Sequence, residues 1–448
     1  MLFRILACAA LTALPCIASG QSAGPTFSHA KRVADVIRRI GEDYVDVLEQ
    51  GPLVERCNEG AAAWLAKSNQ RLDPVSAGPL LQVRLEKMFL DAAQRYPDAD
   101  LAKLADACIH RVFEGLDKHS SYLDRDSFKA MFSASTSSMA GIGLELQTEG
   151  DEVHIVSSIE GTPAARSDLA RGDVIVSVNG APARGLSLTQ VVTLMRGAPG
   201  SDMVLEIRRP GNSVGLLRRE FKREIIRVET VRGGLLEGRL LYVRITQFQE
   251  NTRERFMQRV TEEAARLPEG LAGVILDLRN NPGGLLDSCV GVAAAFLPAN
   301  ALIVELRGRN EDNNRKLLAR RDDIQRFGSS RWPVQLPEPL RSVRLAVLVN
   351  AKSAACSEIV AAAMQDNERA RVIGATTFGI GRVQTIVPMG DSSALRISTA
   401  RYFRPGGAPM ENSPVLPDVQ LAPGDDASVF GGANDPALPA ARKLLLGG

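Results

Sequence analysis

The stretch NAKSAACSEIVAAAMQDNERARVIGATTFGIGRVQ, residues 350–384, decides how the rest of the sequence is interpreted. The continuous apolar run just before it, residues 345–349, is typical of a buried strand. Small and capping residues at 353–358 predict the start of a helix, which residues 359–364 continue. A strand–turn–helix junction of this kind presents backbone N–H groups and one small side chain at the mouth of a sheet. The stretch is therefore where a nucleophile and an oxyanion hole are expected.

This stretch resembles the active-site segment of the carboxyl-terminal, or tail-specific, processing proteases of serine peptidase family S41. In that family, a Ser-Ala-Ser-Ala-Ser-Glu run carries the nucleophilic serine. A Gly-Lys-Gly loop carries the lysine that acts as general base, and a glutamine follows four residues later. Aligned without gaps, this sequence has Ala355 at the nucleophile position, Ile380 at the base position and Gln384 at the retained glutamine that orients the base. Both members of the catalytic dyad are therefore replaced.

The two replacements remove the chemistry that a serine protease needs. A serine attacks an amide only when a neighbouring base takes its proton. Alanine has no nucleophilic atom and isoleucine has no atom that binds a proton, and members of a dyad act as a unit. The thiol of Cys356 and the hydroxyls of Ser353 and Ser357 are left as alternative nucleophiles. No lysine or histidine occurs between residues 353 and 442, so their base would have to come from elsewhere in the chain.

A second motif, DLRNNPGGLL at residues 277–286, follows an apolar run that predicts another buried strand. A proline followed by two glycines lets the backbone come close to a reacting carbonyl, with amides exposed at a helix start. The motif resembles the glycine-rich segment of the same family, and the resemblance implies an oxyanion hole made by the N–H groups of Gly283 and Cys356. The alternative is a tight turn that needs glycine for its geometry alone.

Residues 138–222 look like a PDZ domain, on an ordered set of motifs: GIGLEL at 141–146, RGDVIVSVNG at 171–180 and a predicted helix at 187–196. The resemblance implies a loop whose backbone N–H groups hold a terminal carboxylate, beside a strand edge that pairs with an extended peptide. The residues expected to bind the peptide are Gly141, Ile142, Gly143 and Leu144. The alternative is a small domain retained only for packing.

Composition narrows the class of protein. The 448 residues are 45% hydrophobic and 24% charged, which is an ordinary globular composition for two to three domains. The net charge of +2 gives no reason to expect a nucleic-acid partner. The cysteine and histidine spacings match no zinc pattern, and the sequence predicts neither a metal nor a cofactor.

The first 20 residues predict a secretory signal peptide, because Arg4 precedes an apolar run that ends in small residues. No later stretch has the ~20 consecutive apolar residues of a transmembrane helix. The sequence therefore predicts an exported protein, periplasmic or extracellular, without a transmembrane segment. Four cysteines lie outside the signal peptide, and Cys57 and Cys108 are a candidate disulfide pair because they share the helical region.

The predicted fold class is an α+β multidomain protein. The expected parts are a signal peptide (1–20), a helical N-terminal region with an insert (25–137), a PDZ domain (138–222), an α/β core of the S41 peptidase type (223–425), and a linker with a short C-terminal helix (426–448). The highly charged residues 310–323 are expected to form a solvated excursion from the core.

The functional hypothesis is an exported pseudoprotease that binds protein or peptide C-termini through its PDZ domain without cleaving them. An adaptor or an active paralogue is a candidate partner. The alternative is an active C-terminal processing endopeptidase that uses Cys356 or a displaced serine. A third hypothesis, a purely structural subunit, predicts no affinity for peptides.

Overall fold

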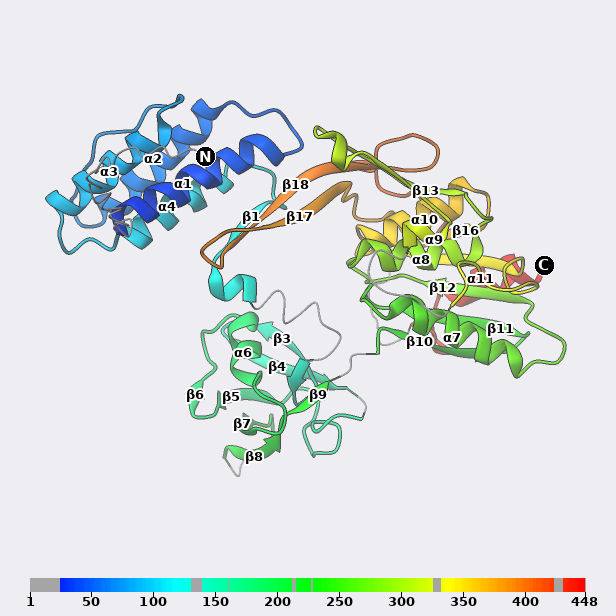
Figure 1. Cartoon of the computed structure of the whole chain (residues 1–448). Coiled ribbons are helices and arrows are strands. Elements are labelled where there is room, and N and C mark those ends of the chain that lie inside the picture. Colours follow the sequence, from blue (N-terminus) through cyan, green and yellow to red (C-terminus); the bar gives the residue numbers. More distant parts are fainter. Residues whose placement is uncertain are drawn as a thin grey trace, which may run out of the picture. The chain divides into compact units, whose positions relative to one another are not determined.

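The computed structural model describes residues 25–129, 139–159, 161–211, 215–226, 229–324, 332–422 and 430–447 (Figure 1). The predicted signal peptide lies outside the described residues. The chain divides into two compact units between Tyr122 and Leu123, and each is described by itself. Helices, parallel strands and antiparallel strands are all present, which confirms the predicted α+β class.

The first unit is helical. Its elements are α1 (Pro25–Asp43), α2 (Gln50–Ala66), α3 (Leu81–Arg95) and α4 (Leu101–Phe113), and β1 (Ser121–Leu123) spans the boundary. Apolar residues at helical spacing, such as Val33, Ile37 and Ile40 of α1, are buried between the helices. The two cysteines of this unit, Cys57 and Cys108, are both buried as free thiols. A hydrogen bond with Cys57 raises the pKa of Cys108, and burial adds to the shift.

The second unit begins with a small antiparallel domain. Its main sheet has the order β3-β4-β5-β7-β8, with β6 paired to β5, while β2 and β9 form a separate ribbon. The bounds are β2 (Met139–Gly141), β3 (Leu144–Glu149), β4 (Glu152–Ser158), β5 (Val174–Val178), β6 (Ala181–Pro182), β7 (Asp202–Arg208), β8 (Leu217–Lys222) and β9 (Glu224–Ile226). Helix α6 (Leu188–Met195) begins after Ser187, which forms a capping box with Gln190. Val191 and Met195 of α6 pack on the sheet.

The core of the second unit is a six-stranded sheet of order β10-β11-β12-β15-β16-β19. Strands β10 and β11 are antiparallel and the remaining pairs are parallel. The bounds are β10 (Val231–Leu236), β11 (Leu240–Ile245), β12 (Gly273–Asp277), β15 (Arg344–Val349), β16 (Arg371–Gly374) and β19 (Val419–Gln420). Because helices cover both faces, the central strands are continuous apolar runs.

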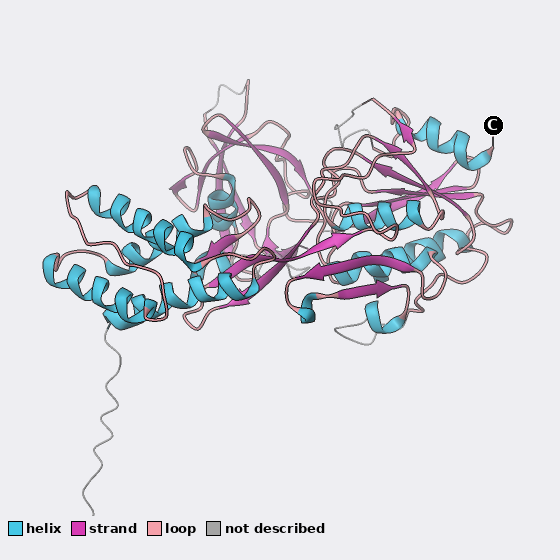
Figure 2. Ribbon diagram, turned by 90° about the horizontal axis from the view of Figure 1, so that it is seen from above, coloured by secondary structure: helices cyan, strands magenta, loops and turns pink. Residues whose placement is uncertain are grey.

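The two faces of this sheet have different covers (Figure 2). Helices α7 (Thr252–Ala265), α8 (Leu286–Phe296) and α10 (Cys356–Asp366) share one hydrophobic cluster with one face. Helix α11 (Ala437–Leu446) packs on the other face. The parallel pairing of Asp277 with Leu348 brings the ends of β12 and β15 to the same edge. That edge is where α8 and α10 begin.

A buried ion cluster joins the C-terminal segment to the end of β12. Arg279 donates to Asp277 and, through two nitrogens, to Asp435 at 2.6 and 2.9 Å. The three residues are at most 4% exposed. Tyr242 donates its hydroxyl to Asp277 at 2.6 Å, and the guanidinium of Arg279 lies 3.8 Å from the ring centre of Phe430. The guanidinium of Arg279 and the carboxylates of Asp277 and Asp435 all have hydrogen-bond partners, as buried charges require.

A second, antiparallel sheet of this unit contains β17 (Arg382–Pro388), β18 (Ala394–Phe403), β13 (Leu302–Gly308) and β14 (Arg315–Leu318). The prediction of a solvated excursion at 310–323 holds only in part: residues 310–312 and 320–322 are exposed, but Leu317 and Ala319 are buried. After the short turn η1 (Glu311–Asn313), β14 pairs with β13, and α9 (Arg321–Ile324) follows. Leu317 and Ala319 are buried in the core because alternate residues of a strand point to opposite faces, which leaves the charged neighbours outside.

None of the described helices has the length and apolar character that a membrane crossing requires.

Candidate functional site

Two strand–turn–helix junctions meet at the edge where β12 and β15 end. The turn after β15 is bonded to the turn after β12 by the Ala354 N–H, which donates to the Asn281 carbonyl at 3.0 Å. Ser357 Oγ donates to the same carbonyl at 2.9 Å, and Ser353 Oγ donates to the carbonyl of Leu278 at 2.8 Å. The 350–358 and 277–286 motifs therefore form a single structure.

Ala355, at the predicted nucleophile position, has an unusual backbone. It is the residue before α10, with φ 49° and ψ −110°, a conformation that residues other than glycine rarely adopt. Such strain costs about 1–3 kcal/mol and persists only where the surroundings impose it. Strained strand-to-helix turns expose the nucleophile in hydrolases, and Ala355 has a strained backbone at a junction of the same kind.

Glu358 connects the turn at Ala355 to the loop formed by residues 379–381. One carboxylate oxygen, Oε2, accepts from the N–H of Ala355 at 2.9 Å and from the N–H of Ile380 at 3.0 Å. The other oxygen, Oε1, accepts from Thr377 Oγ1 at 2.6 Å and from the N–H of Gly379 at 2.7 Å. Burial raises the pKa of Glu358, and the hydrogen bonds counteract this only in part. Two nitrogens on one oxygen place the backbones of Ala355 and Ile380 side by side.

Gln384 lies on β17, and its side chain is only partly satisfied. Its Nε2 donates to Ser398 Oγ at 2.7 Å. Within the described part of the chain, its buried Oε1 has no hydrogen-bond partner. A buried acceptor without a donor costs about 1–3 kcal/mol. The aliphatic side chain of Ile380 cannot supply that donor.

Gly283 lies against the turn that contains Ala355. It has φ +106°, and a Cβ built on it would lie 2.9 Å from the Ala355 Cβ and 3.1 Å from the Cys356 nitrogen. This close approach places the two predicted oxyanion-hole residues next to each other. However, the Gly283 N–H donates to Asn281 Oδ1 at 2.9 Å, so an incoming carbonyl oxygen would have to compete for it.

The alternative nucleophiles are directed inward. Ser353 and Ser357 are fully buried, and both hydroxyls donate to backbone carbonyls. Cys356 is 3% exposed, and its Sγ lies 2.6 Å from the Sγ of Cys289 on α8. In the described part of the chain, the hydrogen bonds found for these three side chains go to backbone groups, to Asn350 and to Cys289, and none of them goes to a lysine or a histidine.

Two functional residues of this site, Glu358 and Asn281, were missed by sequence reasoning. A glutamate three residues after a helix N-cap is the pattern of a capping box, and this signal could have identified Glu358. For Asn281, the only signal was its place inside the DLRNNPGGLL motif at residues 277–286. Its amide nitrogen donates to the carbonyl of Ile245 at 2.9 Å, which fixes the amide oxygen toward Gly283.

The predicted peptide-binding residues lie at the start of the small antiparallel domain. Gly143 has φ +81°, and a Cβ there would lie 2.4 Å from the Thr162 side chain. The Ile142 side chain is buried in the domain core, so only its backbone can face a ligand. Gly141 is the last residue of β2 and is paired with Glu224, which places it in the ribbon.

Leu144, the fourth predicted residue, begins strand β3. This strand is the edge of its sheet, since among the described strands it pairs only with β4. Helix α6 packs beside β3, and Leu144 and Leu146 of β3 are partly buried against the domain core. An edge strand beside a helix is the arrangement that accepts an extended peptide as an added strand.

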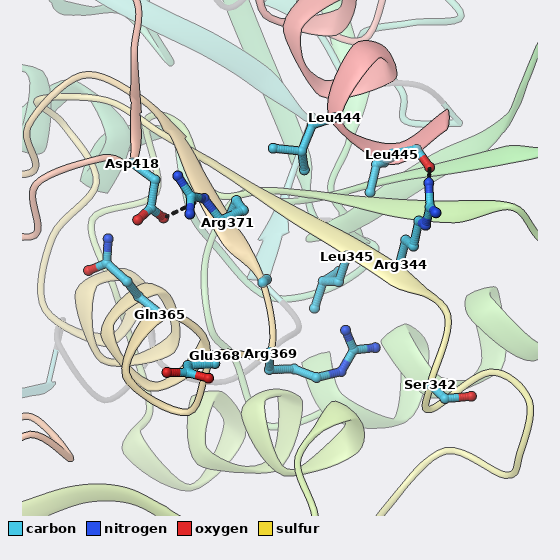
Figure 3. Close-up of a pocket in the computed structure, with 11 residues that line it drawn as sticks. Ser342, Arg344, Leu345, Gln365, Glu368, Arg369, Arg371, Asp418, Leu444 and Leu445 are labelled. Atoms are coloured by element: carbon cyan, nitrogen blue, oxygen red, sulfur yellow. Dashed lines mark hydrogen bonds and ion pairs between the residues drawn. The ribbon is translucent and has the colours of Figure 1, made fainter. Parts of the chain in front are cut away.

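A pocket of about 670 Å³ lies at the opposite end of the core sheet, near the start of β15 and β16 (Figure 3). Its arginines have partners within the chain. Arg369 donates to the carbonyls of Phe296 and Val343, and Arg344 donates to the carbonyl of Leu445. Because the pocket lies at the start of β15 and Ala355 follows the end of this strand, the pocket is separate from the site around Ala355.

Comparison with known proteins gives a consistent family assignment. Residues 239–421 match Peptidase family S41, and residues 154–209 match the PDZ domain. A carboxy-terminal-processing protease of Bartonella bacilliformis is 36% identical over 321 residues, which are 71% of this chain and 70% of that protein. The carboxy-terminal processing protease CtpA of Bacillus subtilis is 30% identical over 326 residues, which are 72% of this chain and 65% of that protein.

A solved structure has the same fold. The photosystem II D1 C-terminal processing protease aligns with 88% of this chain and 94% of its own, with a TM-score of 0.51 and 25% sequence identity. The predicted PDZ domain and peptidase-type core are confirmed by these matches.

Proposed function

This chain belongs to peptidase family S41, and from that membership we propose that it binds the C-termini of proteins or peptides without cleaving them. The proposal extends to its setting: an exported protein that acts as an adaptor, or as the inactive partner of an active paralogue. Its bacterial relatives are named as carboxy-terminal processing proteases. The proposed loss of cleavage is attributed to two side chains, Ala355 and Ile380.

One observation carries the proposal. The N–H groups of Ala355 and Ile380 share a single oxygen of Glu358, so the nucleophile and base positions are neighbours. On the proposed assignment, a methyl group and a butyl group replace the hydroxyl and the amine that would have to exchange a proton. The strained backbone at Ala355 supports descent from a catalytic turn, because strain of this kind serves no purpose in an ordinary helix start.

The binding half of the proposal rests on the PDZ domain. The edge strand β3, the adjoining helix α6 and the Gly143 turn provide backbone groups for an added strand. No step of this recognition requires the Ala355 site. Binding can therefore persist after cleavage has been lost.

The test compares binding and turnover on the same ligand. The full chain is incubated with an unstructured, fluorescently labelled peptide that ends in an apolar residue, with the C-terminally amidated peptide as the matched ligand. We expect the free-acid peptide to bind, the amide to bind much more weakly, and neither to be cleaved.

Two glycine variants make a matched pair for the binding site. Gly143→Ala should weaken binding, because its Cβ would displace Thr162. Gly150→Ala should leave binding unchanged, since Gly150 also has a positive φ (+63°) but nothing lies within 4 Å of a Cβ there.

Other outcomes would contradict the proposal. Turnover that Cys356→Ala or Ser357→Ala abolishes would establish the active endopeptidase instead. Equal affinity for the acid and the amide would exclude recognition of the C-terminus. A complete lack of affinity in a folded chain would favour a purely structural subunit.

A further inference from the structure

Two thiols lie beside the Ala355 turn, and the proposed function uses neither. Cys289 is in the first turn of α8, and Cys356 is the first residue of α10. Their sulfur atoms are 2.6 Å apart. This is closer than non-bonded contact, since even carbon atoms in contact lie about 3.5–4.0 Å apart. The two side chains therefore point directly at each other.

The surroundings of the pair are apolar and closed. Cys289 is 0% exposed and Cys356 is 3% exposed. Sγ of Cys289 donates to the Leu286 carbonyl at 3.2 Å, and Sγ of Cys356 donates to the Gly284 carbonyl at 3.4 Å. Burial raises the pKa of Cys289, and the neighbouring Cys356 adds to the shift. A thiol in this environment is a poor nucleophile and a poor metal ligand.

We propose that Cys289 and Cys356 form a disulfide bond that cross-links the first turns of α8 and α10. The sulfurs need to approach by only about 0.6 Å to reach the bonded distance of about 2.05 Å. The oxidant is a disulfide-containing thiol carrier. One cysteine attacks the carrier disulfide as a thiolate and forms a mixed disulfide, and the second cysteine displaces the carrier thiolate. The two cysteines lose two protons and two electrons, and the carrier disulfide is reduced to two thiols.

The bond forms while the chain folds. Both sulfurs are buried in the folded protein, so the carrier reaches them only before α8 and α10 have packed. The cross-link would close a loop between residues 67 positions apart, which reduces the conformational freedom of the unfolded chain.

The position of the bond gives it a specific effect. Helix α8 begins just after Gly283 and Gly284, and α10 begins just after Ala355. A bond between their first turns fixes the backbone of Gly283 against the amide of Cys356. It also consumes the thiol that an active cysteine protease would need.

The test is peptide mapping of the full chain after refolding in oxidised glutathione. Free thiols are alkylated before digestion with trypsin without reductant, and a disulfide-containing reference protein is refolded in the same mixture. Cys289 and Cys356 then each lie as a single cysteine in one tryptic peptide, Cys289 in 280–307 and Cys356 in 353–369. We expect these two peptides to be linked, and to separate on reduction.

Variants distinguish this pair from the other buried pair. Cys289→Ser should abolish the link and release Cys356 to alkylation, while the double change Cys57→Ser with Cys108→Ser should keep it. Reduction should lower the thermal midpoint of the double variant and leave that of Cys289→Ser with Cys57→Ser and Cys108→Ser unchanged. Recovery of both peptides alkylated and unlinked, while the reference protein has regained its own disulfides, would overturn the inference.

Discussion

At the scale of single residues, Glu358 organises the site. It accepts four hydrogen bonds, from Thr377 Oγ1 and from the N–H groups of Ala355, Gly379 and Ile380. It has no part in the chemistry of a Ser-Lys dyad. A carboxylate can accept at both oxygens, whereas an amide would point two N–H groups at existing donors. The arrangement of these two backbone segments therefore depends on Glu358, whatever side chains stand at positions 355 and 380.

Glu358→Gln should destabilise the fold, because at least one pair of donors is left facing an NH₂ group. The expected loss is about 2–3 kcal/mol in the free energy of unfolding, measured by urea denaturation. Glu368→Gln is the matched control just after the same helix; its side chain is exposed, so a change within about 0.5 kcal/mol is expected. Equal effects of the two changes would show that the Glu358 contacts contribute nothing.

A second residue-scale prediction concerns Gly283. In Gly283→Ala, the new Cβ would meet the Ala355 Cβ at 2.9 Å in a backbone conformation that disfavours side chains. We expect a loss of about 1–3 kcal/mol in the free energy of unfolding. Gly390→Ala is the control, because it has no positive φ and nothing lies within 4 Å of its Cβ. A Gly283→Ala protein as stable as the control would mean that the two turns do not touch.

At the scale of elements, the buried cluster around Arg279 attaches the C-terminal segment to the sheet. Burial by itself would raise the pKa of Asp435, but hydrogen bonds from Arg279 and from the N–H groups of Gly431 and Ala437 outweigh it and lower the pKa. A lowered pKa means that this carboxylate stabilises the fold at pH above its ordinary value of 3.8. The contribution is lost as the pH falls through the lowered value.

Asp435→Asn should therefore destabilise the second unit at neutral pH and have less effect in acid. Removing one partner of a buried ion pair costs about 3–5 kcal/mol, and we expect the lower end because Arg279 keeps Asp277. Urea denaturation at pH 7 and near pH 3 measures both values. A stability difference that does not shrink toward low pH would contradict the assignment of the effect to the Asp435 charge.

Some elements of the fold follow from local sequence patterns, and others depend on pairing between distant segments. The helix predicted at 187–196 and the helix start predicted at 353–358 agree closely with Leu188–Met195 and with Cys356–Asp366, because apolar spacing and capping residues are local signals. The prediction of a solvated excursion at 310–323 failed at its two buried apolar residues, Leu317 and Ala319, which lie among charged residues in the sequence. Their burial depends on the pairing of β14 with β13, which no local pattern contains.

At the scale of the whole molecule, the resemblance of short motifs to the family predicts where the site lies, but it does not predict the hydrogen bonds there. The positions of Ala355, Ile380 and Gly283 follow from a gapless match of short motifs. The occupation of the Gly283 N–H by Asn281 could not be foreseen, because an asparagine side chain has several possible partners in a turn. The assignment of the oxyanion hole to Gly283 and Cys356 stays a prediction, and one of its two amides already has a partner.

The last prediction concerns the catalytic site as a unit of the whole chain. Ala355→Ser with Ile380→Lys should give hydrolysis of the unstructured apolar-tailed peptide, because the strained turn, Glu358 and Gln384 are all in place. We expect the amine of a lysine at position 380 to donate to Oε1 of Gln384, a buried oxygen without a partner among the described residues. We expect at least about tenfold more turnover than either single change gives, well below the ~10²–10⁴-fold that a positioned base can supply. Each single change should stay at background because the pair acts together.

The double variant and its two single controls are assayed for product by mass spectrometry at neutral and alkaline pH, since the lysine must lose its proton to act as a base. Activity in one single variant would show that the other dyad member is not needed, and would contradict the positions assigned to the pair. A folded but inactive double variant would argue that the hold of Asn281 on the Gly283 N–H also blocks the site. Asn281→Ala added to the double variant would then free that amide, and turnover that appears only in this third step would identify the hydrogen bond as the remaining obstacle.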